Sequence, residues 1–156
     1  MSEAVRIEEG GLAELDSVMA VMRDSFDPAF GEAWTAPQCA GLLPMPGVWL
    51  SLACDGGKVV GFALSRSVLN EAELLLLAVA RSHQGKGIGA LLLDRFVMIS
   101  QRKGVEELHL EMRDGNPALQ LYERAGFSEV GRRRNYYTGS DGRLYDALTL
   151  SRPAKS

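Results

Sequence analysis

Hydrophobic positions along this chain recur with two different periods, and each change of period marks a new element. Apolar residues three or four positions apart predict helices, whereas short alternating or continuous apolar runs predict strands. The predicted strands are 5–8, 48–54, 58–68, 73–79, 107–112, 128–134 and 144–150. The predicted helices are 12–26, 35–43, 87–103 and 116–125. The resulting order is β-α-α-β-β-β-α-β-α-β-β.

Turn-forming residues separate these elements. Asp55-Gly56-Gly57 predicts a tight hairpin, so the strands on either side of it should pair antiparallel. A second turn at Leu69-Asn70 leads into run 73–79, whose continuous apolar sequence suits a strand buried on both faces. A long connection, 135–143, contains Tyr136 and Tyr137. The whole pattern predicts an α/β or α+β fold, a mixed sheet with helices packed on it.

Length and composition indicate one soluble domain spanning residues 1–156. The sequence is 46% hydrophobic and 24% charged, and no run approaches the ~18 uncharged apolar residues of a membrane span. Residues 1–10 contain three glutamates and no apolar run, unlike a secretory signal, so we expect a cytoplasmic protein without a membrane partner. A net charge of -3 argues against nucleic acid, because that binding depends on neutralising phosphates.

Two features that could bind ligands are interpreted as structural. Cys39 and Cys54 lie in unrelated apolar surroundings, with no paired cysteine motif and no histidine at ligand spacing, which predicts no disulfide and no metal site. Arg132, Arg133 and Arg134 form a short basic run, which is typical of a solvated strand face.

The stretch 84–90 is the most informative part of the chain. It lies between the buried strand 73–79 and the helix that starts at Gly87, and it carries three glycines at alternate positions. Glycines leave backbone amides open to a ligand, and the first turn of a helix offers unpaired N–H groups and a positive dipole end. The stretch therefore predicts an anion site, most simply for a phosphate or pyrophosphate. Its residues are Gln84, Gly85, Lys86, Gly87, Ile88, Gly89 and Ala90.

Two familiar phosphate motifs do not fit this stretch. A P-loop requires Ser or Thr directly after its lysine, but Lys86 is followed by Gly87. A dinucleotide fingerprint matches the spacing Gly85-x-Gly87-x-x-Ala90, yet it should turn directly off a first parallel strand. Here about five residues separate Val79 from the first glycine, and the preceding strands form hairpins.

With these residues in view, the chain resembles the GNAT superfamily of acyl-coenzyme A-dependent N-acyltransferases. Gln84-x-x-Gly87-x-Gly89 matches the family's Gln/Arg-x-x-Gly-x-Gly/Ala signature. Three further segments resemble the ribosomal-protein-alanine N-acetyltransferase branch. These segments are Leu77-Ala78-Val79, Leu110-Glu111-Met112-Arg113, and Arg133-Arg134-Asn135-Tyr136-Tyr137 followed by Asp141-Gly142-Arg143.

The resemblance implies a mostly antiparallel GNAT-like sheet and acetyl-CoA as acyl donor, with no metal. The backbone of Leu77, Ala78 and Val79 would pair with the pantetheine arm, and residues 84–90 would hold the pyrophosphate. Asn116 would contact the arm of the coenzyme, although its spacing to Tyr122 is one residue shorter than in the family pattern. Glu111 matches the general base, and Tyr122 matches the tyrosine that serves the departing thiolate.

The acceptor implied by the branch is the N-terminal α-amine of a protein, such as a ribosomal protein. Residues 135–143 would then shape the acceptor groove. Alternation places Glu111 and His109 on one strand face, opposite Leu108, Leu110 and Met112, so either could act as base. Three alternatives stay open at this stage: a small-molecule amine, a lysine side chain, or a non-catalytic acyl-CoA-binding module.

Overall fold

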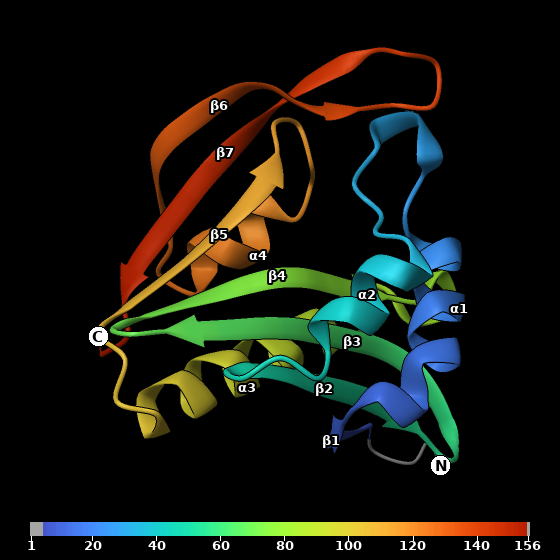
Figure 1. Cartoon of the computed structure of the whole chain (residues 1–156), viewed down its shortest axis with the longest axis vertical. Coiled ribbons are helices and arrows are strands. Elements are labelled where there is room, and N and C mark those ends of the chain that lie inside the picture. Colours follow the sequence, from blue (N-terminus) through green and yellow to red (C-terminus); the bar gives the residue numbers. More distant parts are fainter. Residues whose placement is uncertain (1–4, 156) are drawn as a thin grey trace.

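A computed structural model describes residues 5–155 and contains one seven-stranded sheet (Figure 1). The strands are β1 (Arg6–Gly10), β2 (Val48–Asp55), β3 (Lys58–Val68), β4 (Glu71–Val79), β5 (Glu107–Arg113), β6 (Ser128–Thr138) and β7 (Leu144–Pro153). The α-helices are α1 (Leu15–Ser25), α2 (Ala36–Leu42), α3 (Ile88–Arg102) and α4 (Leu119–Arg124). The order of strands and α-helices is the predicted one.

The sheet has the spatial order β1-β2-β3-β4-β5-β7-β6. All neighbouring strands are antiparallel except β4 and β5, which are parallel because α3 crosses over between them. The turn at Asp55-Gly56-Gly57 joins β2 to β3 antiparallel, as predicted. The predicted fold class, a mixed and mostly antiparallel sheet flanked by helices, is therefore confirmed.

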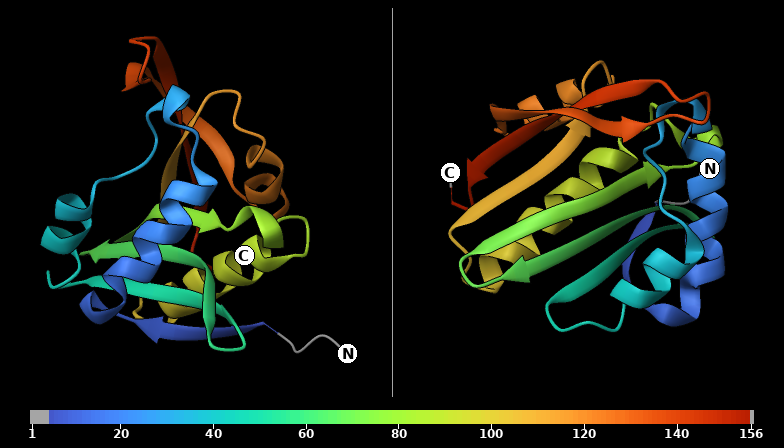
Figure 2. Two further views of the ribbon diagram at one scale, coloured as in Figure 1. Left: turned by 90° about the vertical axis from the view of Figure 1, so that its right-hand side faces the viewer. Right: turned by 45° about the horizontal axis from the view of Figure 1, so that its top comes forward.

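Helices cover both faces of the sheet (Figure 2). On one face, the apolar side of α1 packs with α2 against alternate residues of β2, β3 and β4, including Leu50, Phe62 and Leu76. On the other face, Ile88, Leu92 and Phe96 recur at helical spacing along α3 and are buried against the sheet. Both cysteines are free and buried, as expected for small hydrophobes. None of the helices in 5–155 is long and apolar enough to cross a membrane.

The C-terminal hairpin differs from the prediction. Strand β6 continues to Thr138, so Tyr136 and Tyr137 lie on a strand and not in the long connection expected over 135–143. A register shift between Arg133 and Tyr137, with Asn135 at a φ of 54°, interrupts the ladder to β7. This bulge hides the alternation that would have extended the predicted strand. The arginine run is solvent-exposed on β6, as predicted.

Candidate active site

Strands β4 and β5 separate partway along their length. They pair only from Glu71 opposite Glu107 to Leu74 opposite Leu110, and beyond that point they diverge in a V (Figure 1). The divergence begins at a bulge in β4, where Leu75 is an extra residue relative to β3. An extra residue bends a strand and reverses which side chains face which layer. Leu74 accordingly packs toward α3, whereas Leu76 packs toward α1.

A cleft of about 450 Å³ occupies the V. Its walls come from β4, β5, α4, β6 and the segment between α1 and α2. Eight of the residues predicted from the sequence to form a site line it, which is most of that set. They are Leu77, Ala78, Val79, Gln84, Gly89, Glu111, Asn116 and Tyr122.

One wall of the cleft is the free edge of β4. The edge facing away from β3 has no strand partner after Leu74, so the peptide groups at positions 77–79 can pair with an extended ligand. The Gln84 side chain is tied to this edge, because its Nε2 donates to the Val79 carbonyl oxygen over 2.9 Å. This bond holds the start of the glycine loop against the end of β4.

The glycine loop and the start of α3 form an open cradle beside that edge. Gly85 and Gly87 have φ values of 77° and 82°, and a Cβ added to either would meet nothing within 4 Å. Gly87 caps α3 without a side-chain hydrogen bond, so the first amides of this 15-residue helix stay available. Lys86 and Ala90 are exposed, while the Ile88 side chain points into the core. These residues fit a diphosphate.

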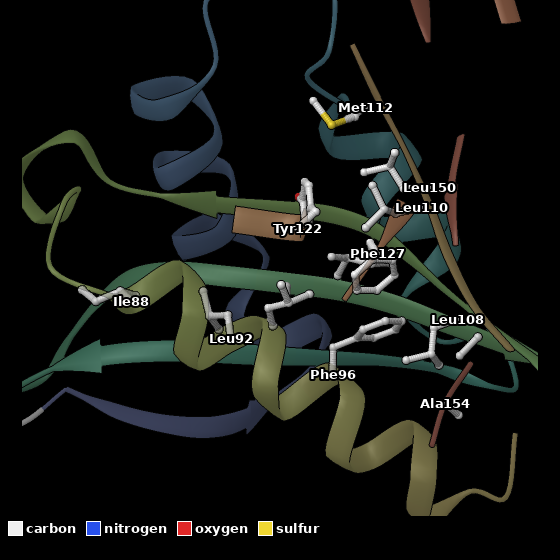
Figure 3. Close-up of a cluster of buried hydrophobic side chains, with 14 of the residues drawn as sticks. Ile88, Leu92, Phe96, Leu108, Leu110, Met112, Tyr122, Phe127, Leu150 and Ala154 are labelled. Carbon is white, nitrogen blue, oxygen red and sulfur yellow. The ribbon is translucent and has the colours of Figure 1, made fainter. Parts of the chain in front are cut away.

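Glu111 and Tyr122 face the cleft from different elements. The Glu111 side chain is 12% exposed, and its Oε1 lies 2.6 Å from Nε of Arg133 on β6. Tyr122 projects from α4 and is buried, with its ring edge-to-face against Phe127 (Figure 3). Burial first, and the charge of Glu32 second, raise the pKa of the Tyr122 phenol. Tyr122 therefore stays protonated at neutral pH.

His109, the alternative base, lies outside the cleft. It lies on the same face of β5 as Glu111, as alternation predicted, but it does not line the large cleft. Its Nε2 is 3.9 Å from Oε1 of Glu73, and the two residues line a smaller cavity of about 220 Å³. Between the two candidates, Glu111 has the direct access to the cleft.

Glu32 and Arg113 also line the cleft, although the sequence predicted a site role for neither. Glu32 lies between α1 and α2, and its carboxylate accepts from Nε of Arg113 at the end of β5. The Asn116 side chain also joins this pair, because its Nδ2 donates to Glu32 over 3.4 Å. No local motif identifies Glu32. It is 81 positions from Arg113 in the sequence, and only the fold brings the two residues together.

Comparison with known proteins defines the class. Residues 15–127 match the acetyltransferase (GNAT) family, and the chain belongs to that family. Ribosomal protein bS18-alanine N-acetyltransferase of Haemophilus influenzae is 39% identical over 97 residues, covering 62% of this chain and 66% of that relative. The Escherichia coli K12 protein of the same name is 42% identical over 100 residues, covering 64% and 67%. The predicted family and branch resemblance are thus confirmed.

One solved structure has a name that corresponds to those of these two relatives. The crystal structure of the ribosomal-protein-S18-alanine N-acetyltransferase from Escherichia coli superposes with a TM-score of 0.88 at 30% identity. That match covers 98% of this chain and 96% of the other. The likeness therefore extends over the whole fold, although the sequence alignments cover about two thirds of the curated relatives.

Proposed function

We propose that this protein transfers the acetyl group of acetyl-CoA to the N-terminal α-amine of a protein. The observation that carries the proposal is the single cleft between β4 and β5. That cleft is lined by the free edge of β4 at positions 77–79, by Gln84 and Gly89 of the glycine stretch, and by Glu111 and Tyr122. A donor site and two proton-carrying groups therefore lie in one continuous space.

In the donor half, backbone groups provide most of the binding. Leu77, Ala78 and Val79 pair with the amide groups of the coenzyme arm, as an added strand would. The amides of residues 85–90 bind the diphosphate at the positive end of α3, with Lys86 adding a charge from the exposed side. Asn116 orients the arm with the second hydrogen of its Nδ2, because its bond to Glu32 uses only one.

In the acceptor half, acetyl-CoA supplies an activated thioester, and side chains of this protein transfer the protons. Glu111 takes a proton from the acceptor ammonium, directly or through one water, so that the nitrogen can attack. As the new C–N bond forms and the C–S bond breaks, Tyr122 donates its proton to the leaving sulfur. Glu111 passes that first proton to solvent and then takes the second proton that the nitrogen loses as the amide forms. Tyr122 regains a proton from solvent, so each transfer turns an ammonium and a thioester into an amide and a free thiol and releases one proton.

The proposed acceptor follows from the relatives and from the shape of the cleft. The two curated relatives described above carry names that specify the alanine of ribosomal protein bS18. In this chain, Tyr136 and Tyr137 line the acceptor end of the cleft from β6, and their rings meet edge-to-face. We therefore propose a ribosomal protein N-terminus as the acceptor, which would place the reaction in the cytoplasm.

Peptide acetylation by the purified protein tests this proposal. A peptide with a free N-terminal alanine is compared with the same peptide blocked at its N-terminus and carrying an internal lysine. Thiol release gives the rate, and mass spectrometry locates the acetyl group. We expect rapid acetylation of the free α-amine and background rates for the blocked peptide.

The other outcomes identify the alternative functions. Acetylation of the internal lysine or of small free amines at equal rates would overturn the N-terminal assignment. Tight acetyl-CoA binding in calorimetry with no turnover on any amine would indicate a non-catalytic binding module. Absence of any binding heat would overturn the donor site itself.

A further inference from the structure

Glu32 is bonded through its carboxylate to two other residues of the cleft, Arg113 and Asn116. Its side chain is 12% exposed, and that of its partner Arg113 is 10% exposed. One carboxylate oxygen accepts from Arg113 Nε, and the other accepts from Asn116 Nδ2. A nearly buried charge is stable only when such partners satisfy it. Both carboxylate oxygens are therefore committed to fixed neighbours.

The segment that carries Glu32 is held against the C-terminal hairpin. Ser140 N donates to the Pro28 carbonyl oxygen over 3.0 Å, and the Phe30 ring packs edge-to-face on Tyr145 with centroids 5.4 Å apart. The Arg113 guanidinium carbon lies 3.7 Å from the centroid of Phe30. These contacts fix the backbone just before Glu32, so its carboxylate has a defined position.

A chain of hydrogen bonds leads from Glu32 to the helix that carries Tyr122. Asn116 donates to Glu32 through Nδ2, and its Oδ1 accepts from the Ala118 amide over 2.9 Å. The Ala118 carbonyl oxygen then accepts from the Tyr122 amide over 3.2 Å. Because α4 has only six residues, its first turn sets the position of the Tyr122 ring. Glu32 thus fixes α4 through Asn116.

The charge of Glu32 also acts on the phenols of the cleft. It raises the pKa of Tyr122 and of Tyr137, in each case as the second cause after burial. Tyr137 is itself affected by Tyr122, so the two phenols and the carboxylate share one small space. Glu111 also raises the pKa of Tyr137, and Arg113 is the ion-pair partner of Glu32.

We propose that Glu32 is a positioning residue for acetyl transfer that acts through Tyr122. Its bond to Asn116 sets the location of the tyrosine, and its charge opposes ionisation of the phenol. Glu32 does not itself contact the reacting atoms in this role. The inference rests on the proposed function of Tyr122 as the group that serves the leaving thiolate.

A double-mutant cycle between Glu32→Gln and Tyr122→Phe tests this role with the full-length protein. Glu32→Gln keeps the shape but removes the charge, and we expect kcat to fall about tenfold with the KM for acetyl-CoA within about twofold of wild type. In the Tyr122→Phe background, the same substitution should cost less than about twofold. An equal loss in both backgrounds would overturn the proposal, because a general structural defect would act regardless of the tyrosine.

Glu73→Gln is the matched control. Glu73 is also a cleft carboxylate paired with an arginine, since its Oε1 accepts from Arg66 over 3.0 Å, but no contact links it to Asn116 or Ala118 within residues 5–155. Glu73→Gln should change kcat by the same factor in the wild-type and Tyr122→Phe backgrounds. If Glu32→Gln does not fold, Asn116→Ala replaces it, since that change cuts the link to α4 while leaving the Glu32–Arg113 pair intact.

A measurement independent of turnover separates this inference from the proposed function. Tyrosinate absorbance during alkaline titration, with the Tyr122→Phe signal subtracted, isolates the ionisation of Tyr122. Glu32→Gln should shift that ionisation to lower pH, because a negative neighbour is lost. An unchanged midpoint would overturn the coupling even in an active enzyme, and a shifted midpoint in a protein that acetylates nothing would refute only the proposed function.

Discussion

The Glu111 carboxylate on β5 is ion-paired with the Arg133 guanidinium on β6, across the intervening strand β7, with Oε1 2.6 Å from Nε. The two partners differ in environment, because the Glu111 side chain is 12% exposed and that of Arg133 is 63% exposed. A pair with one solvent-exposed partner is worth at most ~1 kcal/mol. The acceptor ammonium can therefore displace the arginine from the carboxylate at small cost.

This relationship predicts different outcomes for the two residues. Glu111→Gln should lower kcat about a hundredfold, because the base is lost from the cleft. Arg133→Gln should change kcat/KM by less than about threefold, since the pair contributes little. Steady-state kinetics with a peptide acceptor measures both. A large loss in Arg133→Gln with full activity in Glu111→Gln would reverse the roles assigned here.

The glycine cradle gives a second prediction, on coenzyme affinity. Gly87→Ala places a methyl group where the diphosphate should lie, and it forces a left-handed residue that costs ~1–2 kcal/mol. We expect the Kd for coenzyme A to rise about tenfold or more by titration calorimetry.

Gly104→Ala is the control for backbone strain. Gly104 follows the other end of α3 and has a φ of 79°, with nothing within 4 Å of an added Cβ. The Gly104→Ala variant should lose about as much stability as Gly87→Ala but should keep the coenzyme affinity of the wild type. If both variants bind equally well, the loop is not the diphosphate site.

Much of the proposed donor half could be predicted because it is formed by residues that lie close together in the sequence. The glycines at 85, 87 and 89 lie within five consecutive residues, and their proposed function depends on backbone geometry that glycine itself permits. The order of strands and helices along the chain followed in the same way from hydrophobic periodicity and from turns such as Asp55-Gly56-Gly57. Local patterns therefore predicted the fold and the cradle.

The acceptor half depends on contacts between distant segments. Glu32 comes near Arg113 and Asn116 only because the α1–α2 segment folds over the end of β5, and nothing in its own neighbourhood indicates this. The bulge at Leu75, which separates β4 from β5, is equally invisible in an apolar run of four leucines. Features made by tertiary packing or by register shifts leave no periodic signal in the sequence.

Tyrosine burial predicts how stability depends on pH. The pKa of Tyr122 is raised in the folded state, chiefly by burial, whereas in the unfolded chain it is near 10. Above about pH 10 the unfolded state therefore holds fewer protons than the folded state, and the free energy of unfolding falls as pH rises. The contribution of Tyr122 to stability is fully present below that pH.

Tyr122→Phe should make this alkaline loss of stability shallower. Urea unfolding at pH 8, 9, 10 and 11 measures the slope in each protein, with Tyr137→Phe as a parallel case because burial also raises the pKa of Tyr137. Equal slopes in wild type and Tyr122→Phe would mean that the Tyr122 phenol is accessible to solvent, contrary to its position in the core.

The contact between the α1–α2 segment and the hairpin predicts an effect on acceptor binding and, through Glu32, on kcat. Gly31 has a φ of 69°, and a Cβ added there would overlap the Thr138 carbonyl oxygen at the end of β6. Gly31→Ala should therefore push the segment off the hairpin and widen the acceptor end of the cleft. We expect the KM for peptide to rise at least about threefold, with the KM for acetyl-CoA unchanged, because the glycine cradle lies at the other end.

Gly142→Ala distinguishes this contact from simple strain. Gly142 lies in the turn of the same hairpin with a φ of 84°, and an added Cβ would meet nothing within 4 Å. Both substitutions incur a similar cost for a left-handed residue, but only the one at Gly31 breaks the contact between segment and hairpin. A matching rise in peptide KM for Gly142→Ala would show that general loosening of the hairpin, and not the Gly31 contact, controls acceptor binding.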